Sequence, residues 1–221
     1  MHNFRASFQT GFRMPSSQTQ FINLNLGRII LVGGLPDVYN SYGLNDYNFT
    51  VSSAGAFGAA VGADVAGGKD TGQAAVDNLG LLKQYKFTNL KPEGLKSIEL
   101  GYKGLINNRL LLDIAGYYSF YDNFQAARRV LVTSSNPSVD PLGAAIDIST
   151  GNYKVYGVYD NSPDEVTSYG VAAGVSYTNQ KGYSINTNYT FARLDLGDSK
   201  DDLIAAFNTP EHKVNFSIGN R

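Results

Sequence analysis

Hydrophobic and polar side chains alternate along several stretches of this chain, with the period of two that is typical of a β-strand with one buried face. In residues 166–177, aromatic and branched side chains such as Tyr169 and Val175 alternate with small and polar ones. Residues 183–192 repeat the pattern, and the polar segment 179–182 separates the two stretches. This arrangement predicts two antiparallel strands joined by a short turn.

Four further segments follow the same alternation and bring the expected number of strands to six, each about ten residues long. These segments are residues 3–9, 97–103, 109–122 and 213–219. The alternation is less regular in residues 109–122, because leucine and tyrosine also occupy its polar side. The pattern therefore predicts an all-β fold built on an up-and-down antiparallel sheet.

The connections between these strands alternate between short and long. Two are short turns, at residues 106–108 and 179–182, whereas three are long, at about residues 13–92, 126–164 and 194–211. A soluble domain seldom contains structureless connections longer than about 15 residues. Outer-membrane barrels have short turns on the inner side and long loops on the outer side, and their closure pairs every backbone group in lipid. We therefore expect strands of an antiparallel transmembrane β-barrel.

In such a barrel, one face of each strand contacts lipid and the other faces the lumen. We expect the polar rows to line the lumen and to form an ion network there. The residues assigned to this lumen face are Arg5, Glu99, Lys103, Asp113, Asn186, Asn188 and Lys213. Aromatic residues at both ends of the apolar rows match the two girdles of membrane barrels. The girdle residues are Tyr102, Tyr177 and Tyr183 at the inner end and Phe120, Tyr169 and Phe191 at the outer end.

The composition of the 221 residues fits a β-rich protein and excludes several kinds of site. Charged residues make up 17%, below the roughly 25% of ordinary soluble domains, and the chain contains 24 glycines and 15 tyrosines. The lack of cysteine excludes disulfides, cysteine-ligated metals and thiol nucleophiles. With histidine only at His2 and His212, we expect no metal centre and no enzyme. The net charge of −1 gives no reason to expect a nucleic-acid partner.

The first long connection carries candidate ligand contacts. Tyr39, Tyr42 and Tyr47 lie close together in an asparagine-containing stretch, and such rings either stack on a sugar, peptide or chelate or pack within their own loop. Both interpretations stay open. Residues 54–68 are rich in glycine and alanine, but their spacing matches no phosphate-binding motif. A flexible loop or a short alanine-rich helix is the expectation there.

The last long connection contains a cluster of carboxylates. Its members are Asp195, Asp198, Asp201 and Asp202. Carboxylate oxygens are ligands that Ca²⁺ prefers, although the spacing is not that of an EF-hand. We favour a solvated outer loop and keep a calcium site as the alternative.

Several short strings, in order along the chain, resemble one known family. They are GFRMP at residues 11–15, LKPE at 90–93, SIELGY at 97–102, NRL at 108–110, SYGV at 168–171, NYT at 188–190 and FNTPEHK at 207–213. These strings are similar to the C-terminal β-barrel portion of TonB-dependent outer-membrane receptors, of the type found in Bacteroidetes. The resemblance covers most of the chain and is thinnest at residues 35–85 and 130–160.

The resemblance implies a receptor of the Gram-negative outer membrane that imports a scarce ligand, such as a siderophore, glycan, peptide or cofactor. It implies a barrel of about 22 strands, filled by a plug domain and driven by a TonB-type energy-coupling complex, with no nucleotide cofactor. The partners would be outer-membrane lipid, the coupling complex, the ligand and, as an open case, a surface lipoprotein. Six strands cannot close such a barrel, and the sequence shows neither a plug nor a signal peptide, so we expect either an internal fragment of a longer receptor or a truncated gene product.

Two alternatives use the same strands differently. A passive outer-membrane pore would close a smaller barrel with additional strands. A soluble β-sandwich would turn the apolar faces inward and bind carbohydrate with its tyrosine-rich loops.

Overall fold

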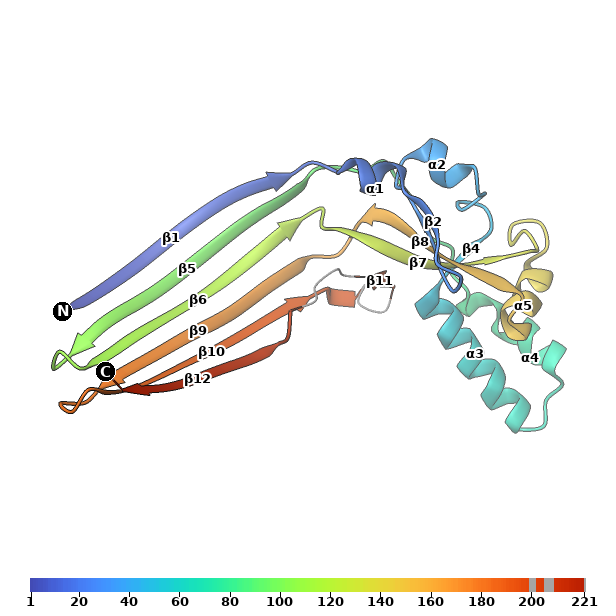
Figure 1. Cartoon of the computed structure of the whole chain (residues 1–221). Helices are drawn as coiled ribbons and strands as arrows, with labels where there is room; N and C mark the ends of the chain where they lie inside the picture. Colours follow the sequence, from blue (N-terminus) through green and yellow to red (C-terminus); the bar gives the residue numbers. More distant parts are fainter. Residues whose placement is uncertain (199–201, 205–208, 221) are drawn as a thin grey trace.

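The computed structural model describes residues 1–198, 202–204 and 209–220, and it consists of a long curved sheet and a mixed α/β body at one end (Figure 1). The long sheet, called sheet A, has six antiparallel strands in the order β1-β5-β6-β9-β10-β12. Its strands are β1 (His2–Arg13), β5 (Glu93–Ile106), β6 (Leu110–Asp122), β9 (Val166–Thr178), β10 (Tyr183–Asp195) and β12 (His212–Asn220). The six strands expected from the alternation are therefore present, in up-and-down order.

The register of sheet A keeps each kind of side chain on one face. Phe4 lies opposite Tyr102, and Tyr118 lies opposite Tyr169. On the other face, Lys103 lies opposite Asp113. Since directly opposed residues project to the same side of a sheet, the six apolar rows form one continuous face and the polar rows form the other.

Most strands of sheet A are longer than the sequence pattern indicated. Five of the six contain 12 to 14 residues, against the expected length of about ten. The difference arises partly because charged residues replace apolar ones near the outer ends, as at Lys96 and Arg193, while the hydrogen-bond ladder continues. The alternation of side chains therefore ends before the strands do.

The two short turns close as predicted. Asn107 and Asn108 have φ values of 49° and 53°, the left-handed conformation that a tight hairpin needs and that asparagine tolerates. In the second turn, Gly182 has a φ of 85°, and the Asn179 side chain accepts hydrogen bonds from the backbone amides of Lys181 and Tyr183. Both turns lie at the end of sheet A away from the α/β body (Figure 1).

The long connections fold into that α/β body, which we call the outer domain and define as residues 14–92, 123–165 and 202–204. It contains sheet B, in the order β11-β7-β8-β3-β2 with β4 on the free part of β7, and β3 runs parallel to β8. Its strands are β2 (Asn23–Asn25), β3 (Ile30–Val32), β4 (Asn48–Thr50), β7 (Gln125–Thr133), β8 (Tyr153–Asn161) and β11 (Leu203–Ile204). Its helices are α1 (Ser17–Phe21), α2 (Pro36–Asn40), α3 (Val51–Ala66), α4 (Thr71–Asn78), η1 (Leu79–Leu81) and α5 (Pro141–Thr150). The structure is mostly strand and thus confirms the expected all-β class, and its helices lie in the outer domain.

Helix ends in the outer domain follow local capping chemistry. The Thr50 hydroxyl accepts from the Ser53 amide at the start of α3, and Asp70 caps α4 in the same way. Helix α5 starts with an Asp140 cap and ends at Gly151, which has a φ of 76°. The glycine- and alanine-rich residues 54–68 therefore form most of a helix rather than a flexible loop.

Two apolar clusters hold the outer domain together. One lies between sheet B, α2 and the segment before β5, and includes Val32, Leu44, Phe87, Val130 and Val158. The other joins α3, α4 and α5, and is centred on the fully buried Phe57. Because both clusters combine residues far apart in the chain, the outer domain is a packed body and not a set of separate loops.

Sheet A continues directly into the outer domain. Strand β6 leads into β7 through Asn123, which has a φ of 53°, and β8 leads into β9, so the β6–β9 pair extends as the β7–β8 pair (Figure 1). At this junction the buried Glu93 carboxylate accepts hydrogen bonds from the Arg13 guanidinium, at 2.9 Å, and from the backbone N–H of Gln125, at 2.8 Å. These contacts join β1, β5 and β7 where the two parts meet.

Sheet A has no core of its own. Its apolar face is exposed, with Phe216 at 67%, and one edge each of β1 and β12 is unpaired within the described residues. Among the residues that the structure describes, no helix is both long and apolar enough to cross a membrane.

Candidate transport surface

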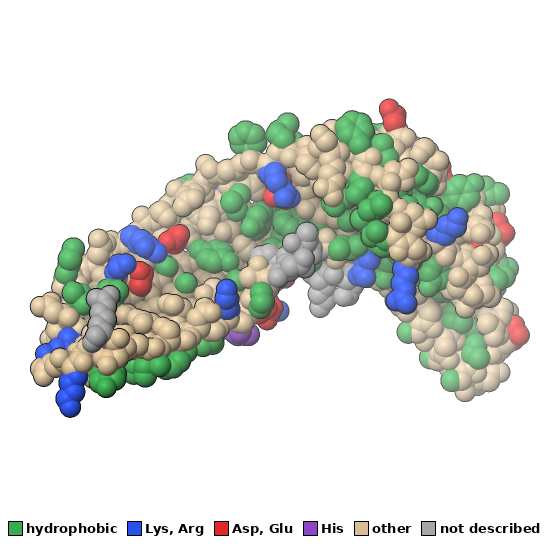
Figure 2. Space-filling view, viewed as in Figure 1, with side chains coloured by type: hydrophobic (Ala, Val, Ile, Leu, Met, Phe, Trp, Pro, Cys, Tyr) green, Lys and Arg blue, Asp and Glu red, His purple; other side chains and the backbone are tan. Residues whose placement is uncertain are grey.

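The polar face of sheet A carries two ion pairs near β1, β5 and β6 (Figure 2). Lys103 and Asp113 lie directly opposite each other, with their charged atoms 3.1 Å apart. Arg5 lies opposite Gly101 and reaches Glu99 at 3.3 Å. A side chain at Gly101 would collide with Arg5, whose Nε would be 2.4 Å from an added Cβ, so the glycine makes room for this pair.

The amide residues predicted for this face lie on β10, next to smaller partners. Asn186 contacts the hydroxyls of Ser176 and Ser217 on the neighbouring strands. Asn188 lies opposite Gly174, where an added Cβ would be 2.9 Å from its side-chain oxygen. Asn186 also lines a polar cavity of about 220 Å³ beside the β9–β10 turn. The inner end of this face therefore offers hydrogen-bonding groups rather than net charge.

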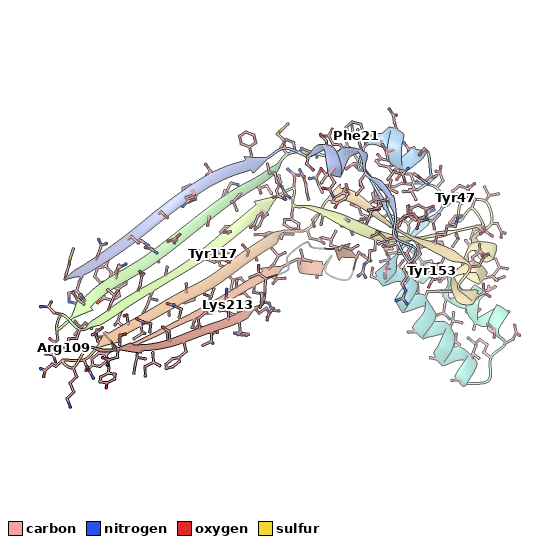
Figure 3. The ribbon with its side chains drawn as sticks, viewed as in Figure 1. Phe21, Tyr47, Arg109, Tyr117, Tyr153 and Lys213 are labelled. Atoms are coloured by element: carbon pink, nitrogen blue, oxygen red, sulfur yellow. The ribbon has the colours of Figure 1, made fainter. Side chains whose placement is uncertain are left out.

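The predicted ion network does not extend across the whole polar face. Lys213 lies opposite Thr190 on β12, which is four strands away from β5, and it forms no ion pair within the described residues. Among the described residues, the predicted network is therefore two separate pairs, and Lys213, labelled in Figure 3, lies apart from both. The wide sheet keeps these charges apart, because neighbouring strands are about 4.8 Å apart and three strands, β6, β9 and β10, lie between β5 and β12.

Tyr117 also lies on the polar face and was not selected as a site residue from the sequence. Its ring lies over Gly170 on β9, where an added Cβ would be 2.7 Å from the ring. The large and small residues at this pair were visible as an irregularity in the alternation, although their contact required the register. Tyr117 gives the otherwise small-residue centre of the face an aromatic group (Figure 3).

The outer aromatic residues of the apolar face form a connected row across β6, β9, β10 and β12. The Tyr118 and Tyr169 rings stack at 5.8 Å with an interplanar angle of 8°, and Phe120 lies 4.9 Å from Tyr118. Phe191 lies 6.1 Å from Tyr169 and 5.2 Å from His212. The structure thus brings together the three residues predicted for the outer end and adds Tyr118 and His212 to them.

The inner aromatic residues are more dispersed. Tyr102 packs on Phe4, with ring centroids 5.0 Å apart, and its hydroxyl lies 2.7 Å from Nδ1 of His2. Tyr177 and Tyr183 flank the β9–β10 turn on the same face. Both histidines of the chain therefore lie on the apolar face beside tyrosines, a role that their sequence positions did not reveal.

The tyrosines of the first long connection do not converge on one surface. Tyr39 is 3% exposed, lies in the core of the outer domain and donates a 3.4 Å hydrogen bond to the Phe87 carbonyl. Burial raises the pKa of its hydroxyl. Tyr42 packs on Tyr156 with ring centroids 5.6 Å apart, and Tyr47 is half-buried. Internal packing, one of the two interpretations of these rings, is what the structure shows for Tyr39 and Tyr42.

Tyr153 occupies a more accessible place in the outer domain. It is 38% exposed and lines a polar cavity of about 320 Å³ with Thr133, Ser134, Asn152 and Lys154. It also borders an apolar groove of about 490 Å³ between α3, α5 and sheet B. No local sequence pattern indicates this site, because the lining residues come from both sides of α5 and from distant α3.

The carboxylates of the last long connection that the structure describes make local contacts and form no metal-ligand group with one another. The buried Asp202 accepts from the Ser52 amide and hydroxyl, both at 2.9 Å, and lies 3.9 Å from Arg128. Asp195 accepts from the Gly197 amide, and Asp201 lies outside the described residues. The described part of the chain contains no group of three or more carboxylate or histidine side chains placed to hold a metal. Asp202 therefore joins the last connection to α3 instead.

Comparison of the chain with known proteins and protein families gives one match. No curated protein and no solved structure matches the chain. A family model described as "TonB dependent receptor-like, beta-barrel" matches residues 1–220, which include sheet A and the whole outer domain. Because this match covers nearly the entire chain, and because sheet A has the alternation and the short turns of a barrel wall, the chain belongs to the TonB-dependent receptor-like β-barrel family.

Proposed function

We propose that sheet A is an arc of the wall of an outer-membrane receptor barrel, with the apolar face toward lipid and the polar face toward the lumen. The register carries this proposal, because apolar rows meet apolar rows at all five strand interfaces. A face with Phe216 at 67% exposure is unfavourable in water and favourable in lipid. The free edges of β1 and β12 are then where further strands of the wall pair.

The orientation follows from the two ends of sheet A. Short turns at Asn107 and Asn179 mark the inner side, and the outer domain faces the exterior. Family membership supports import of a scarce ligand, driven by a TonB-type coupling complex on the inner side. The siderophore, glycan, peptide and cofactor classes all remain consistent with this architecture. The assignment to the Bacteroidetes type stays a prediction.

The site around Tyr153 is where we place ligand capture. Its exposed ring borders both a polar and an apolar cavity, so it offers a stacking surface beside the hydroxyl, amide and ammonium groups of the exposed Ser134, Asn152 and Lys154. Tyr42 and Tyr47, which also lie in the outer domain, stay predicted ligand contacts. Tyr39 reaches a ligand only if its core packing opens, so we leave it out of the proposed site.

The two alternative functions differ in how they use the apolar face. A β-sandwich requires a second sheet over that face, but sheet B extends beyond the end of sheet A and leaves Phe4, Val214 and Phe216 exposed (Figure 1). The soluble sandwich is therefore not the arrangement of this chain. A passive pore shares the wall geometry, and the family match favours the receptor over it.

The assignment of the faces is tested with two arginine substitutions in the natural protein. Val175 lies on the apolar face between the two aromatic rows, and Asn186 lies on the polar face of the adjacent strand. Val175→Arg places a charge in lipid, at a cost of up to about 2–4 kcal/mol near the midplane, and should reduce assembly in the outer membrane. Asn186→Arg should assemble normally. The measurement is the amount of heat-modifiable, protease-resistant protein in outer-membrane fractions, and normal assembly of Val175→Arg would reject the assignment.

A further inference from the structure

The apolar face of sheet A contains a hollow at Gly116. The surrounding side chains come from four strands and enclose about 330 Å³. They are Ile98, Leu100, Tyr118, Tyr169, Val171 and Phe191. Gly116 lies opposite Leu100 and Val171, so the hollow exists because one position in the middle of the apolar row lacks a side chain.

Aromatic rings line the side of this hollow that is nearer the outer domain. Tyr118 and Tyr169 stack nearly parallel, and Phe191 continues the row. Glycine at position 116 is not required by the backbone or by close packing, because an added Cβ would lie 3.6 Å from the Gly170 carbonyl oxygen and 3.7 Å from Val171, which are ordinary contacts. The empty volume therefore results from the sequence and not from a steric need.

Charged residues follow the aromatic row on the same face. Arg193 lies directly opposite Tyr169, and His212 lies directly opposite Phe191. Lys96, at the same end, already pairs with Asp122 at 2.8 Å, whereas Arg193 is exposed and forms no ion pair within the described residues. Arg193 thus has no counter-charge among the described residues, and it lies at the outer boundary of the proposed lipid-facing surface.

We propose that the hollow and Arg193 together bind one lipid that has an acyl chain and a phosphate-bearing headgroup. This inference rests on the proposed function, which places the apolar face in the outer membrane. The acyl chain lies in the hollow against the stacked tyrosines, and the phosphate accepts hydrogen bonds from the Arg193 guanidinium. His212, whose Nδ1 lies 2.8 Å from the Tyr189 hydroxyl, borders the headgroup.

The dimensions allow one molecule to use both parts. Val171 at the hollow and Tyr169 beside Arg193 are two residues apart on β9, which is about 7 Å along the strand. That separation matches a headgroup phosphate and the upper part of its own acyl chain. In a zwitterionic lipid such as phosphatidylcholine the choline cation already neutralises the phosphate, whereas the phosphate of an anionic lipid has no counter-charge within its own headgroup, so the charge of Arg193 selects the anionic class.

The experiment is native mass spectrometry of the natural protein in neutral detergent, titrated with dioleoyl-phosphatidylglycerol and, separately, with dioleoyl-phosphatidylcholine or inorganic phosphate. Gly116→Leu fills the hollow with another apolar group, and Arg193→Gln removes the cation. We expect each variant to lose roughly tenfold in phosphatidylglycerol affinity. Matched controls are Ala173→Leu, which adds leucine to the same face outside the hollow, and Lys213→Gln, which removes a cation from the polar face.

Each outcome decides between explanations. Loss of phosphatidylglycerol binding in both variants, with both controls unchanged, supports the site. If Gly116→Leu binds phosphatidylglycerol as tightly as the wild type, the acyl chain does not occupy the hollow and the proposal is overturned. If the wild type binds phosphatidylcholine as tightly as phosphatidylglycerol, the proposed role of Arg193 is overturned. Binding of inorganic phosphate at the same concentration would indicate a free-anion site, and a dimeric mass would indicate a second copy on this face. Absence of the wild-type protein from outer-membrane fractions would instead reject the proposed function itself.

Discussion

Asp160 on β8 shows how one residue can limit the stability of the outer domain. Its side chain is 1% exposed, and its Oδ2 accepts a 2.6 Å hydrogen bond from the Tyr85 hydroxyl. The Arg128 guanidinium lies 4.2 Å from the centre of the same Tyr85 ring. Burial raises the pKa of Asp160 and outweighs the opposing effects of Tyr85 and Arg128, and the charge of Asp160 in turn adds to the burial that raises the pKa of Tyr85.

The direction of this shift fixes the expected pH dependence. Because the pKa of Asp160 is higher in the folded chain than the ordinary value of 3.8, the folded state binds the proton more tightly than the unfolded state. The contribution of Asp160 to the free energy of unfolding of the outer domain should therefore fall as the pH rises from below 3.8 through the folded-state pKa, and then level off. Hydrogen exchange of β7 and β8 amides measures this.

The variant Asp160→Asn serves as the comparison, because an amide of similar size keeps an acceptor for Tyr85 and does not titrate. We expect its hydrogen-exchange protection to lose the part of the pH dependence that lies above the ordinary carboxyl pKa of 3.8 and arises from Asp160. A pH dependence identical to that of the wild type would show that Asp160 does not titrate in this range.

Tyr153 is the residue whose removal should reduce ligand capture. Tyr153→Ala deletes an exposed ring beside the polar cavity, and stacking of this kind contributes about 0.5–1.5 kcal/mol, which corresponds to a roughly twofold to tenfold loss of affinity. Uptake and binding assays with ferric chelates, glycans and peptides provide the measurement. Unchanged binding of every imported compound would remove Tyr153 from the site.

Tyr39 provides the matched control for Tyr153. Because Tyr39 is buried, Tyr39→Ala should destabilise the outer domain, by about 3–5 kcal/mol if it behaves like other large aromatic truncations. Tyr39→Phe should leave folding intact, since the hydroxyl forms only a 3.4 Å hydrogen bond. A loss of binding by Tyr39→Ala would thus accompany a loss of folding, whereas that of Tyr153→Ala would not.

At the scale of elements, the strands of sheet A were predictable because the side-chain pattern of each strand shows by itself that one of its faces is apolar and the other polar. A strand with an apolar and a polar side shows the period of two whatever its neighbours are, and the turn residues Asn107 and Gly182 mark its ends. The assignment of Phe4, Tyr102 and Tyr169 to one face needed no knowledge of the register. The register then confirmed it.

The elements of the outer domain were not predictable in the same way. Its strands β2, β3 and β4 contain three residues each, which is too short for any period, and β3 pairs in parallel with distant β8. Helices α3 and α5 contain many glycines and alanines, so apolar residues are not confined to one face. Capping residues such as Thr50 and Asp140 were visible in the sequence, but they mark helix starts only when a helix is already expected.

The candidate sites also differ in whether a local sequence pattern or a tertiary contact determines them. Arg5, Glu99, Lys103 and Asp113 were placed correctly on one face by parity, and their separation from Lys213 required the strand order. Tyr153 was missed because its cavity combines β7, β8, α3 and α5. Tertiary contacts between distant segments leave no local pattern, and sequence reasoning has access only to local patterns.

At the scale of the whole molecule, sheet A determines how the isolated chain behaves. Its exposed apolar face and the free edges of β1 and β12 favour association in water. We expect the chain of 221 residues, refolded from urea, to aggregate in buffer and to stay dispersed in detergent. Light scattering and circular dichroism with and without detergent measure this, and a stable monomer in buffer with the same strand content would contradict the proposed lipid-facing surface.

The outer domain is assembled from three segments that strands of sheet A separate in the chain. Ile30 pairs with Tyr156, and Ser52 binds Asp202 across 150 positions of sequence. Contacts of such long range form late, because the intervening chain must first be ordered. We therefore expect the outer domain to be completed only after β5, β6, β9 and β10 have aligned. On this expectation, a folded outer domain indicates that the strands of sheet A have already paired. An antibody or ligand that recognises the folded surface of the outer domain would then detect only receptors whose strands are paired.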